Sequence, residues 1–276
     1  MKKIVLSFLL VYSASGFAQE IGLQLYSVRN QIPNDVKGTL ALIKSWGITQ
    51  LEGGGTYGMT TEEFLKLCQE NSLKVVSIGA GFEELETDAT KVVERAKSFG
   101  VKYVMCSWLP HQNDVFTKAD ANRAIATFNK AGKLLAENGL TLCYHMHGYE
   151  FVPNGAGDKK DLFDYIVENT DKKNVNFEMD VYWVKQGGVD PVALLKKYPK
   201  RFKMLHLKDR KPGTPNSTDG HADVETNVVL GTGDVNIAEV MRVAKKIGIV
   251  YYFIEDESSR VAEQVPQSVR FLRSLK

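Results

Sequence analysis

Short apolar runs and longer amphipathic segments alternate along the chain from residue 21 onward. The strand-like runs lie at residues 21–26, 48–52, 73–80, 101–108, 140–150, 174–180, 202–209 and 249–257. The segments between them repeat apolar residues at three- and four-residue spacings, which is the periodicity of a helix with one buried face. Examples of these helix-like segments are residues 35–46, 60–71, 88–99, 121–138, 161–169 and 237–247.

A glycine stands directly before four of the predicted strands, at Gly47, Gly100, Gly139 and Gly248. Glycine in this place is typical of a helix C-terminus, so each one separates a helix from the strand that follows. Eight strand-then-helix units without a linker predict an α/β fold of one domain, a closed (β/α)8 TIM barrel. An open doubly wound sheet is the alternative, but no Gly-x-Gly-x-x-Gly motif follows the first strand.

The first 19 residues have the three regions of a secretory signal peptide. Lys2 and Lys3 are followed by the apolar stretch Ile4–Val11 and by the small-x-small site Gly16-Phe17-Ala18. The apolar stretch is too short for a membrane span, and a buried first strand or helix is the weaker alternative. We therefore expect a signal peptide at 1–19, a catalytic barrel at 20–276, and a periplasmic or secreted protein with no membrane attachment.

The charge balance does not favour nucleic-acid binding. The chain has 35 basic and 33 acidic residues, and removal of Lys2 and Lys3 leaves 33 of each. Sequence-independent binding of nucleic acid needs a basic surface, which a neutral chain does not predict. The three cysteines, Cys68, Cys106 and Cys143, are an odd number and are expected to be buried free thiols rather than a disulfide framework.

Four strand-like runs in the second half of the chain end in residues of the kind that bind metals. The candidates are Glu150, with His145 and His147 beside it, then Asp180, His206 and Glu255. The carboxyl ends of parallel barrel strands meet at one face, so these distant residues can share one divalent cation. Carboxylate oxygens with an imidazole suit Mn²⁺, Mg²⁺ or a related ion.

Other interpretations of the same residues stay open. Asp180 could form a salt bridge with Lys208 or Arg210 instead of binding a metal. At the last strand, a shift of one or two residues would put Asp256 or Glu257 in the place of Glu255.

His145 and His147 are two residues apart and so share one face of the fifth strand. Both can therefore point into the barrel. An imidazole titrates near neutral pH, which suits proton transfer.

Six motifs, taken in order, resemble those of the xylose isomerase-like TIM-barrel superfamily. They are IGLQLYSVR (21–29), YHMHGYEF (144–151), MDVYWV (179–184), HLKD (206–209), GTGDVN (231–236) and IED (254–256). The resemblance covers essentially the whole mature chain and is strongest to the exported sugar phosphate isomerase/epimerase group. It implies one divalent metal, most often Mn²⁺ with Mg²⁺, Co²⁺ or Zn²⁺ as alternatives. The matching ligands are Glu150, Asp180, His206 and Glu255, and the two glutamates would double as acid/base groups.

The fifth strand departs from the ketose epimerases of this superfamily. Those enzymes carry a glutamate on the strand itself, whereas this strand ends in Tyr144-His145-Met146-His147 and Glu150 lies beyond it. In this respect the strand is more similar to inosose dehydratases and to relatives that cleave keto-glycosides. Glu150 could still reach the metal from its loop, or His145 or His147 could be the ligand or the base.

Five further residues are candidates for substrate binding. They are Lys208, Trp183, Trp108, Glu52 and Tyr57. Lys208 could stabilise an enolate oxygen, the aromatic side chains could stack on a sugar ring, and Glu52 could bind a hydroxyl group. The long irregular segment 210–234 follows the His206 strand and is a candidate lid, in which His221 could close over the site.

The chemistry implied is removal of a proton next to a carbonyl, with a metal ion stabilising the enediolate. Export argues against a sugar phosphate, so we expect a non-phosphorylated keto-sugar and an isomerase or epimerase. A lyase or dehydratase acting on an inosose or a keto-glycoside is the first alternative, and a non-catalytic periplasmic sugar-binding barrel is the second. An endonuclease of the abasic-site type fits a neutral exported chain least well. The expected partner is a small-molecule sugar, and the protein could form a homo-oligomer.

Overall fold

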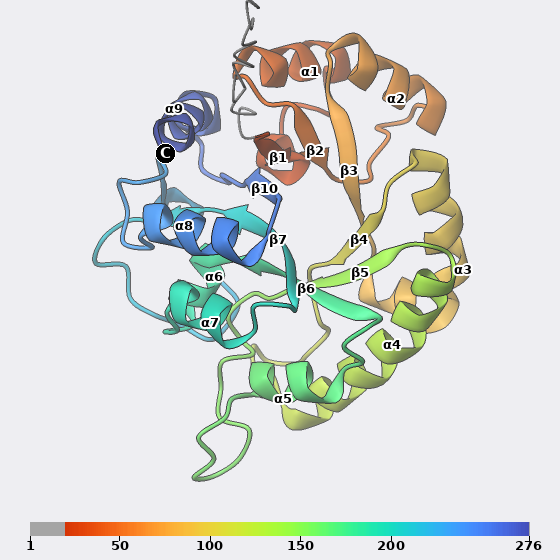
Figure 1. Cartoon of the computed structure of the whole chain (residues 1–276). Helices are drawn as coiled ribbons and strands as arrows, with labels where there is room; N and C mark the ends of the chain where they lie inside the picture. Colours follow the sequence, from red (N-terminus) through yellow and green to blue (C-terminus); the bar gives the residue numbers. More distant parts are fainter. Residues whose placement is uncertain (1–19, 276) are drawn as a thin grey trace, which may run out of the picture.

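A closed barrel of eight parallel strands forms the centre of the protein, with helices around it (Figure 1). The computed structural model describes residues 20–275, so the predicted signal peptide lies outside the described residues. The order around the barrel is β1-β10-β7-β6-β5-β4-β3-β2. The strands are β1 Gly22–Gln24, β2 Gln50–Glu52, β3 Lys74–Gly79, β4 Tyr103–Cys106, β5 Thr141–His145, β6 Val175–Asp180, β7 Phe202–Leu207 and β10 Tyr251–Ile254. The predicted TIM barrel is confirmed.

Nine α-helices in the described part of the chain surround the strands. They are α1 Val36–Ser45, α2 Thr61–Glu70, α3 Phe82–Phe99, α4 Lys118–Glu137, α5 Leu162–Asn169, α6 Val181–Gln186, α7 Pro191–Lys197, α8 Ile237–Ile247 and α9 Val261–Ser274. Within residues 20–275, none of them is both long enough and apolar enough to cross a membrane.

The helix boundaries follow local signals in the sequence. Gly100 and Gly248 have φ values of 65° and 87°, the left-handed conformation expected of a glycine that ends a helix. Thr60 and Glu63 form a reciprocal capping box at the start of α2. α3 begins six residues before the predicted start at residue 88, because two helical segments join across a non-helical Asp88 (φ −150°, ψ 73°).

The barrel interior has an apolar layer beneath a polar one. Val76, Met105, Cys143, Met204 and Phe253 form a buried cluster of their own, separate from the larger core between strands and helices. Side chains two residues apart point to the same face of a strand. Two residues beyond Cys143, Met204 and Phe253 stand His145, His206 and Glu255, so the polar layer lies at the carboxyl ends of the strands.

The segment 210–234 crosses this end of the barrel and is fixed at its base by Asp209. The Asp209 carboxylate accepts hydrogen bonds from the backbone N–H groups of Gly231, Gly233 and Val235 at 2.8–3.2 Å. A side chain at Gly233 would begin 2.2 Å from the same carboxylate, so glycine is required there. A short antiparallel ladder, β8 Asp209–Arg210 with β9 Asn227–Val228, closes the segment. The Asp209 carboxylate thus connects the motif HLKD (206–209), of which it is the last residue, to the motif GTGDVN (231–236).

Candidate active site

Four buried side chains at the carboxyl ends of neighbouring strands form the candidate metal centre. They are His145 on β5, Asp180 on β6, His206 on β7 and Glu255 just after β10. Each offers one nitrogen or oxygen atom, and these atoms all lie within 4.8 Å of one another. The register of the barrel explains the grouping, because Asp180 pairs with His206 across β6 and β7, and His206 pairs with Phe253 across β7 and β10.

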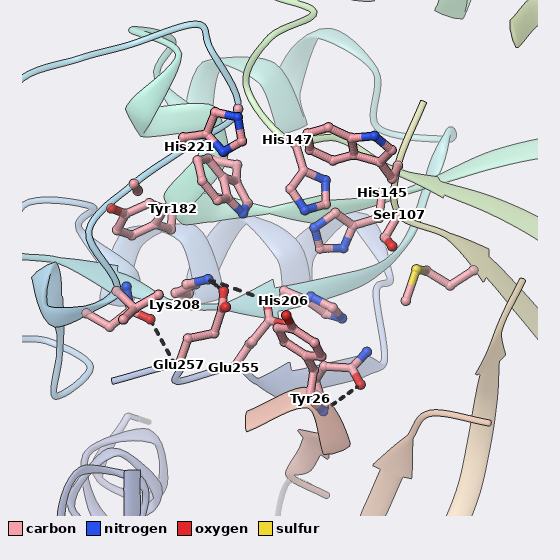
Figure 2. Close-up of a pocket in the computed structure, with 18 residues that line it drawn as sticks. Tyr26, Ser107, His145, His147, Tyr182, His206, Lys208, His221, Glu255 and Glu257 are labelled. Carbon is pink, nitrogen blue, oxygen red and sulfur yellow. Dashed lines mark hydrogen bonds and ion pairs between the residues drawn. The ribbon is translucent and has the colours of Figure 1, made fainter. Parts of the chain in front are cut away.

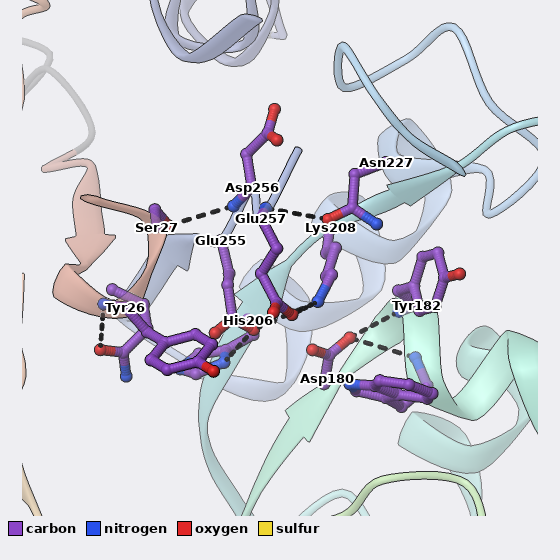
Figure 3. A network of polar contacts seen from close by, with 12 residues as sticks. Tyr26, Ser27, Asp180, Tyr182, His206, Lys208, Asn227, Glu255, Asp256 and Glu257 are labelled. Carbon is purple, nitrogen blue, oxygen red and sulfur yellow. Dashed lines mark hydrogen bonds and ion pairs between the residues drawn. The ribbon is translucent and has the colours of Figure 1, made fainter. Parts of the chain in front are cut away.

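The two carboxylate oxygens of Asp180 have different surroundings: one caps a helix and the other faces the candidate metal donors. Oδ1 accepts the backbone N–H groups of Tyr182 and Trp183, at 2.8 and 3.1 Å, and so caps the first turn of α6 (Figure 3). Oδ2 lies 3.7 Å from Nε2 of His145 and has no hydrogen-bond partner. Burial raises the pKa of Asp180 to about 7, because the buried carboxylate is costly to ionise.

The two histidines of the centre have opposite electrostatic surroundings. Burial lowers the pKa of His145 well below its ordinary value, and the nearby His206 lowers it further. Burial also disfavours the charged form of His206, but Glu178 and Glu255 raise its pKa well above the ordinary value. Nδ1 of His206 lies 3.2 Å from Oε2 of Glu255, so the two donors are held together.

The donor set fits a divalent cation. Within residues 20–275, both ring nitrogens of His145 and Oδ2 of Asp180 are buried without a hydrogen-bond partner. Unpaired buried polar atoms cost free energy, and a bound cation would satisfy them. Two imidazoles with two carboxylates suit Mn²⁺, Co²⁺ or Zn²⁺ better than Mg²⁺, which prefers oxygen ligands.

Glu150 does not join these donors, although it was the predicted fifth-strand ligand. Its carboxylate accepts hydrogen bonds from the Tyr144 hydroxyl and from the backbone N–H of His147. Tyr144 stands on the opposite face of β5 from His145 and packs on Phe128 of α4, with the ring centroids 5.1 Å apart. The structure therefore places Glu150 on the helix side of the barrel wall and His145 among the candidate metal donors.

Lys208 lies next to the centre as a buried ammonium group. It forms an ion pair with Glu257, and its Nζ is 3.7 Å from Oε2 of Glu255. Burial disfavours its charge, but Glu255, Glu257 and Asp180 raise the pKa of Lys208 above its ordinary value. Burial likewise disfavours the charged form of Glu255, yet Lys208 and His206 lower the pKa of that carboxyl well below its ordinary value. Lys208 is thus a cation and Glu255 an anion at neutral pH.

A cavity of about 500 Å³ opens above the metal centre (Figure 2). Its lining includes three of the predicted substrate-binding residues, Lys208, Trp183 and Trp108, and also His147. The ring of His147 lies between the two tryptophans, 5.5 Å from Trp108 and 5.3 Å from Trp183 by ring centroids. Its Nδ1 atom is buried without a hydrogen-bond partner, and the residue is part of the cavity lining.

The predicted lid covers one side of the cavity. Gly220, His221, Ala222, Val224 and Asn227 all line it. The exposed His221 also reaches Asp114, with Nε2 3.1 Å from a carboxylate oxygen.

The other two predicted substrate-binding residues lie elsewhere in the structure. Glu52 is fully buried beneath His206, and Tyr57 packs against Phe64 of α2. Neither is among the residues that line the cavity. Glu52 is the last residue of the three-residue strand β2, and its side chain points into the barrel, where it contacts Gln24 and His206.

Two residues of the site were not among the predicted ones. Glu178 lies two residues before Asp180 on β6 and is fully buried, with Oε1 3.4 Å from Nε2 of His206. Its two-residue spacing from Asp180 is a signal in the sequence that both carboxylates share one face. Glu257, which the sequence offered only as an alternative to Glu255, lines the cavity as the partner of Lys208.

The comparison with known families agrees with this geometry. The family model described as xylose isomerase-like TIM barrel matches residues 40–275. The chain belongs to the xylose isomerase-like TIM-barrel family.

Among solved structures, a sugar phosphate isomerase/epimerase from Parabacteroides distasonis ATCC 8503 superimposes with a TM-score of 0.79. It is 26% identical, and the match covers 96% of this chain and 98% of that one. Among characterised relatives, this xylose isomerase-like barrel is 32% identical over 97 residues to an inosose dehydratase of Clostridium botulinum, which is 35% of this chain and 31% of the relative. It is 27% identical over 159 residues to an inosose dehydratase of Klebsiella pneumoniae, and this match covers 55% of this chain and 50% of the relative. The matches therefore span between about a third and a half of these dehydratases.

Proposed function

We propose that this protein is a divalent-metal-dependent lyase that eliminates a group β to the carbonyl of a non-phosphorylated keto-sugar, such as a keto-glycoside or an inosose. The observation that carries the proposal is the fifth strand, which supplies His145 to the metal centre and His147 to the cavity. Glu150, the carboxylate that would complete a pair of acid/base glutamates with Glu255, is hydrogen-bonded on the other side of the wall. The dehydratase relatives support the same class of reaction.

His147 is the proposed base. Its ring lines the cavity between Trp108 and Trp183, whose rings would hold the flat face of a sugar. His147 would take the proton from the carbon next to the carbonyl, and the C–H electron pair would form the enolate double bond. The enolate oxygen would then re-form the carbonyl, and the enolate carbon–carbon electron pair would form the Cα=Cβ double bond as the Cβ–O bond breaks. The leaving oxygen would keep the electrons of that bond and take the proton from the imidazolium, so the products are an unsaturated ketone and an alcohol or water.

The other residues would hold the reacting groups. His145, Asp180, His206 and Glu255 would bind the cation, which when bound polarises the carbonyl and stabilises negative charge on its oxygen. The Lys208 ammonium, held by Glu257, would stabilise charge on an oxygen at the same edge of the cavity. The proposed metal is Mn²⁺, with Co²⁺ or Zn²⁺ as the alternatives that the two imidazoles favour.

The cavity supports a substrate without phosphate. Of the described residues that line it, Lys208 is the only lysine or arginine, and it is already paired with Glu257. Recognition of a phosphate group usually takes arginine or lysine side chains free to pair with its oxygens. A non-phosphorylated substrate also agrees with the predicted signal peptide and with a periplasmic or secreted location, which remains part of the proposal.

The test is a panel of 3-keto-glycosides, inososes and ketoses, incubated in D₂O with the protein loaded with Mn²⁺, Co²⁺, Zn²⁺ or Mg²⁺. We expect the absorbance of a conjugated enone and release of the leaving group, and loss of both in His147→Ala. Absence of elimination with every substrate and metal would overturn the lyase proposal.

The second candidate is a sugar isomerase or epimerase. The full-length similarity to the Parabacteroides distasonis protein favours it, as does the retained Glu255. In the same experiment, deuterium incorporation at the α-carbon with a rearranged sugar and no enone would select this function. If the protein shows neither deuterium exchange nor conversion of any sugar, the non-catalytic sugar-binding barrel is the function that remains.

A further inference from the structure

Two glutamates lie beneath the metal centre and are used by none of the steps above. Glu52 on β2 and Glu178 on β6 are both 0% exposed, and neither lines the cavity. Both oxygens of Glu178 and Oε1 of Glu52 are buried without a hydrogen-bond partner. Two carboxylates in such a place are costly to bury, so the site must gain something from them.

Both glutamates face the histidines of the metal centre from below: Glu52 faces His206, and Glu178 faces His145 and also lies 3.4 Å from Nε2 of His206. Nε2 of His206 lies 2.5 Å from Oε2 of Glu52, while Nδ1 of the same ring lies 3.2 Å from Glu255. Nδ1 of His145 lies 3.6 Å from Oε2 of Glu178, while Nε2 of that ring lies 3.7 Å from Oδ2 of Asp180. In both rings one nitrogen faces the donors above and the other faces a carboxylate below.

We propose that Glu52 and Glu178 are positioning residues that fix the tautomer and orientation of His206 and His145 for metal binding. A neutral imidazole carries one N–H group, and a carboxylate acceptor retains that proton on the nearer nitrogen. Glu52 would hold the proton on Nε2 of His206, and Glu178 would hold it on Nδ1 of His145. The lone pairs of His206 Nδ1 and His145 Nε2 are then both directed to the cation. Carboxylates that orient metal-bound histidines in this way strengthen metal binding.

The surroundings of Glu52 support a fixed role. Its Oε2 atom also accepts a hydrogen bond of 3.0 Å from the side-chain amide of Gln24 on β1. Gln24 in turn is held by the backbone N–H of Tyr26, which donates to its Oε1 atom. The orientation of His206 is thus connected to the first strand of the barrel.

A second cation between Glu52, Glu178 and His206 is the competing interpretation, because their donor atoms also lie within 4.8 Å of one another. His206 would then have to bind one cation through each ring nitrogen, which requires loss of its only ring proton. The two glutamates also lie below the cavity lining and away from its entrance. Both points favour orientation over a second site.

The inference rests on the metal centre of the proposed function but not on the reaction, so it is tested without substrate. Glu52→Gln and Glu178→Gln keep the shape of the side chain and replace its carboxyl group with an amide. We expect wild type to bind one Mn²⁺ per chain. Titration calorimetry measures this, as does the decrease in the electron paramagnetic resonance signal of free Mn²⁺. Each variant should bind one Mn²⁺ about 10- to 100-fold more weakly. Glu150→Gln, another fully buried glutamate, is the matched control and should bind like wild type.

Unchanged affinity in both glutamine variants would overturn the proposal, and so would two Mn²⁺ per wild-type chain with one lost in the variants. If a variant does not fold, ¹⁵N chemical shifts of the histidines in Zn²⁺-loaded wild type decide the question. We expect His206 to carry its proton on Nε2 and His145 on Nδ1, and the opposite tautomers would exclude the role. A protein that binds one metal but converts no sugar would refute the reaction and leave this inference standing.

Discussion

Oδ2 of Asp180 lies 3.7 Å from Nε2 of His145 on the neighbouring strand, while Oδ1 of the same carboxylate accepts the two N–H groups that begin α6. One side chain therefore links the candidate metal centre to the start of a helix. Because the two oxygens have separate partners, their contributions can be separated by substitution.

Asp180→Asn should weaken metal binding without loss of the helix cap. The amide oxygen can still accept the N–H groups of Tyr182 and Trp183, but the negative charge is gone. We expect the Kd for Mn²⁺ to rise by about 100-fold, or about 2.7 kcal/mol. The free energy of unfolding of the metal-free protein should stay within about 1 kcal/mol of wild type. Asp180→Ala, which loses cap and charge together, is the comparison, and equal metal affinity in wild type and Asp180→Asn would contradict this role.

Saturation with Mn²⁺ should stabilise the folded protein. At a free concentration of 100 times Kd, a ligand that binds only the folded state contributes about 2.7 kcal/mol, which in a chain of this size raises Tm by roughly 5–10 °C. Scanning calorimetry with Mn²⁺ and with EDTA measures the difference. His145→Ala should abolish the shift and His147→Ala should keep it, because only His145 lies among the four donors. The reverse result would move the ligand role to His147.

Glu150→Gln should remove a pH dependence of stability. Burial raises the pKa of Glu150 to about 7 from an ordinary value of 4.5. The folded state therefore keeps a proton that the unfolded state releases, and its stabilising effect is complete below pH 4.5 and is lost as the pH rises through 7. Wild type should lose about 3 kcal/mol across this window relative to the variant. Urea unfolding of both proteins at several pH values measures this, and a difference that does not vary with pH would contradict the raised pKa.

Asp209→Ala should loosen the segment over the cavity. The carboxylate accepts from Gly231, Gly233 and Val235, and buried N–H groups left without an acceptor cost about 1–3 kcal/mol each. We expect at least about 2 kcal/mol of lost stability in urea unfolding and faster proteolysis between residues 211 and 226. Asp223→Ala, which removes one exposed cap bond from the Glu225 N–H in the same segment, is the comparison and should cost about 1 kcal/mol or less. Equal proteolysis of both variants would show that Asp209 does not hold the segment.

Much of the fold was predictable because its signals are local. The two-residue and three- to four-residue periodicities predicted the strands and helices, and the glycines at 100 and 248 predicted where helices end. The strand order and closure then follow from repeated right-handed strand-helix-strand connections. α6, α7 and α9 did not stand out, because α6 and α7 are short and α9 carries Pro266 in its interior.

The fifth strand shows where local signals were insufficient. Glu150 and His145 are both of a kind that binds metals, and they are only five residues apart. The turn after His147 decides between them: Gly148 has φ 91°, and a side chain there would begin 2.9 Å from the Trp183 carbonyl oxygen. This turn directs Glu150 back to Tyr144 on the helix side of the wall.

The sequence by itself determined a barrel with a ring of polar residues at one end, because alternation along each strand is a local property. It also determined that Asp180, His206 and Glu255 stand at that end, and the structure brings them together. Only the tertiary structure decided that His145 completes the group, that Glu150 is turned away and that Glu52 and Glu178 lie beneath the histidines. These relations depend on strand register and on turns between distant segments, where a shift of a single residue moves a side chain from the inner face of the barrel to the outer one.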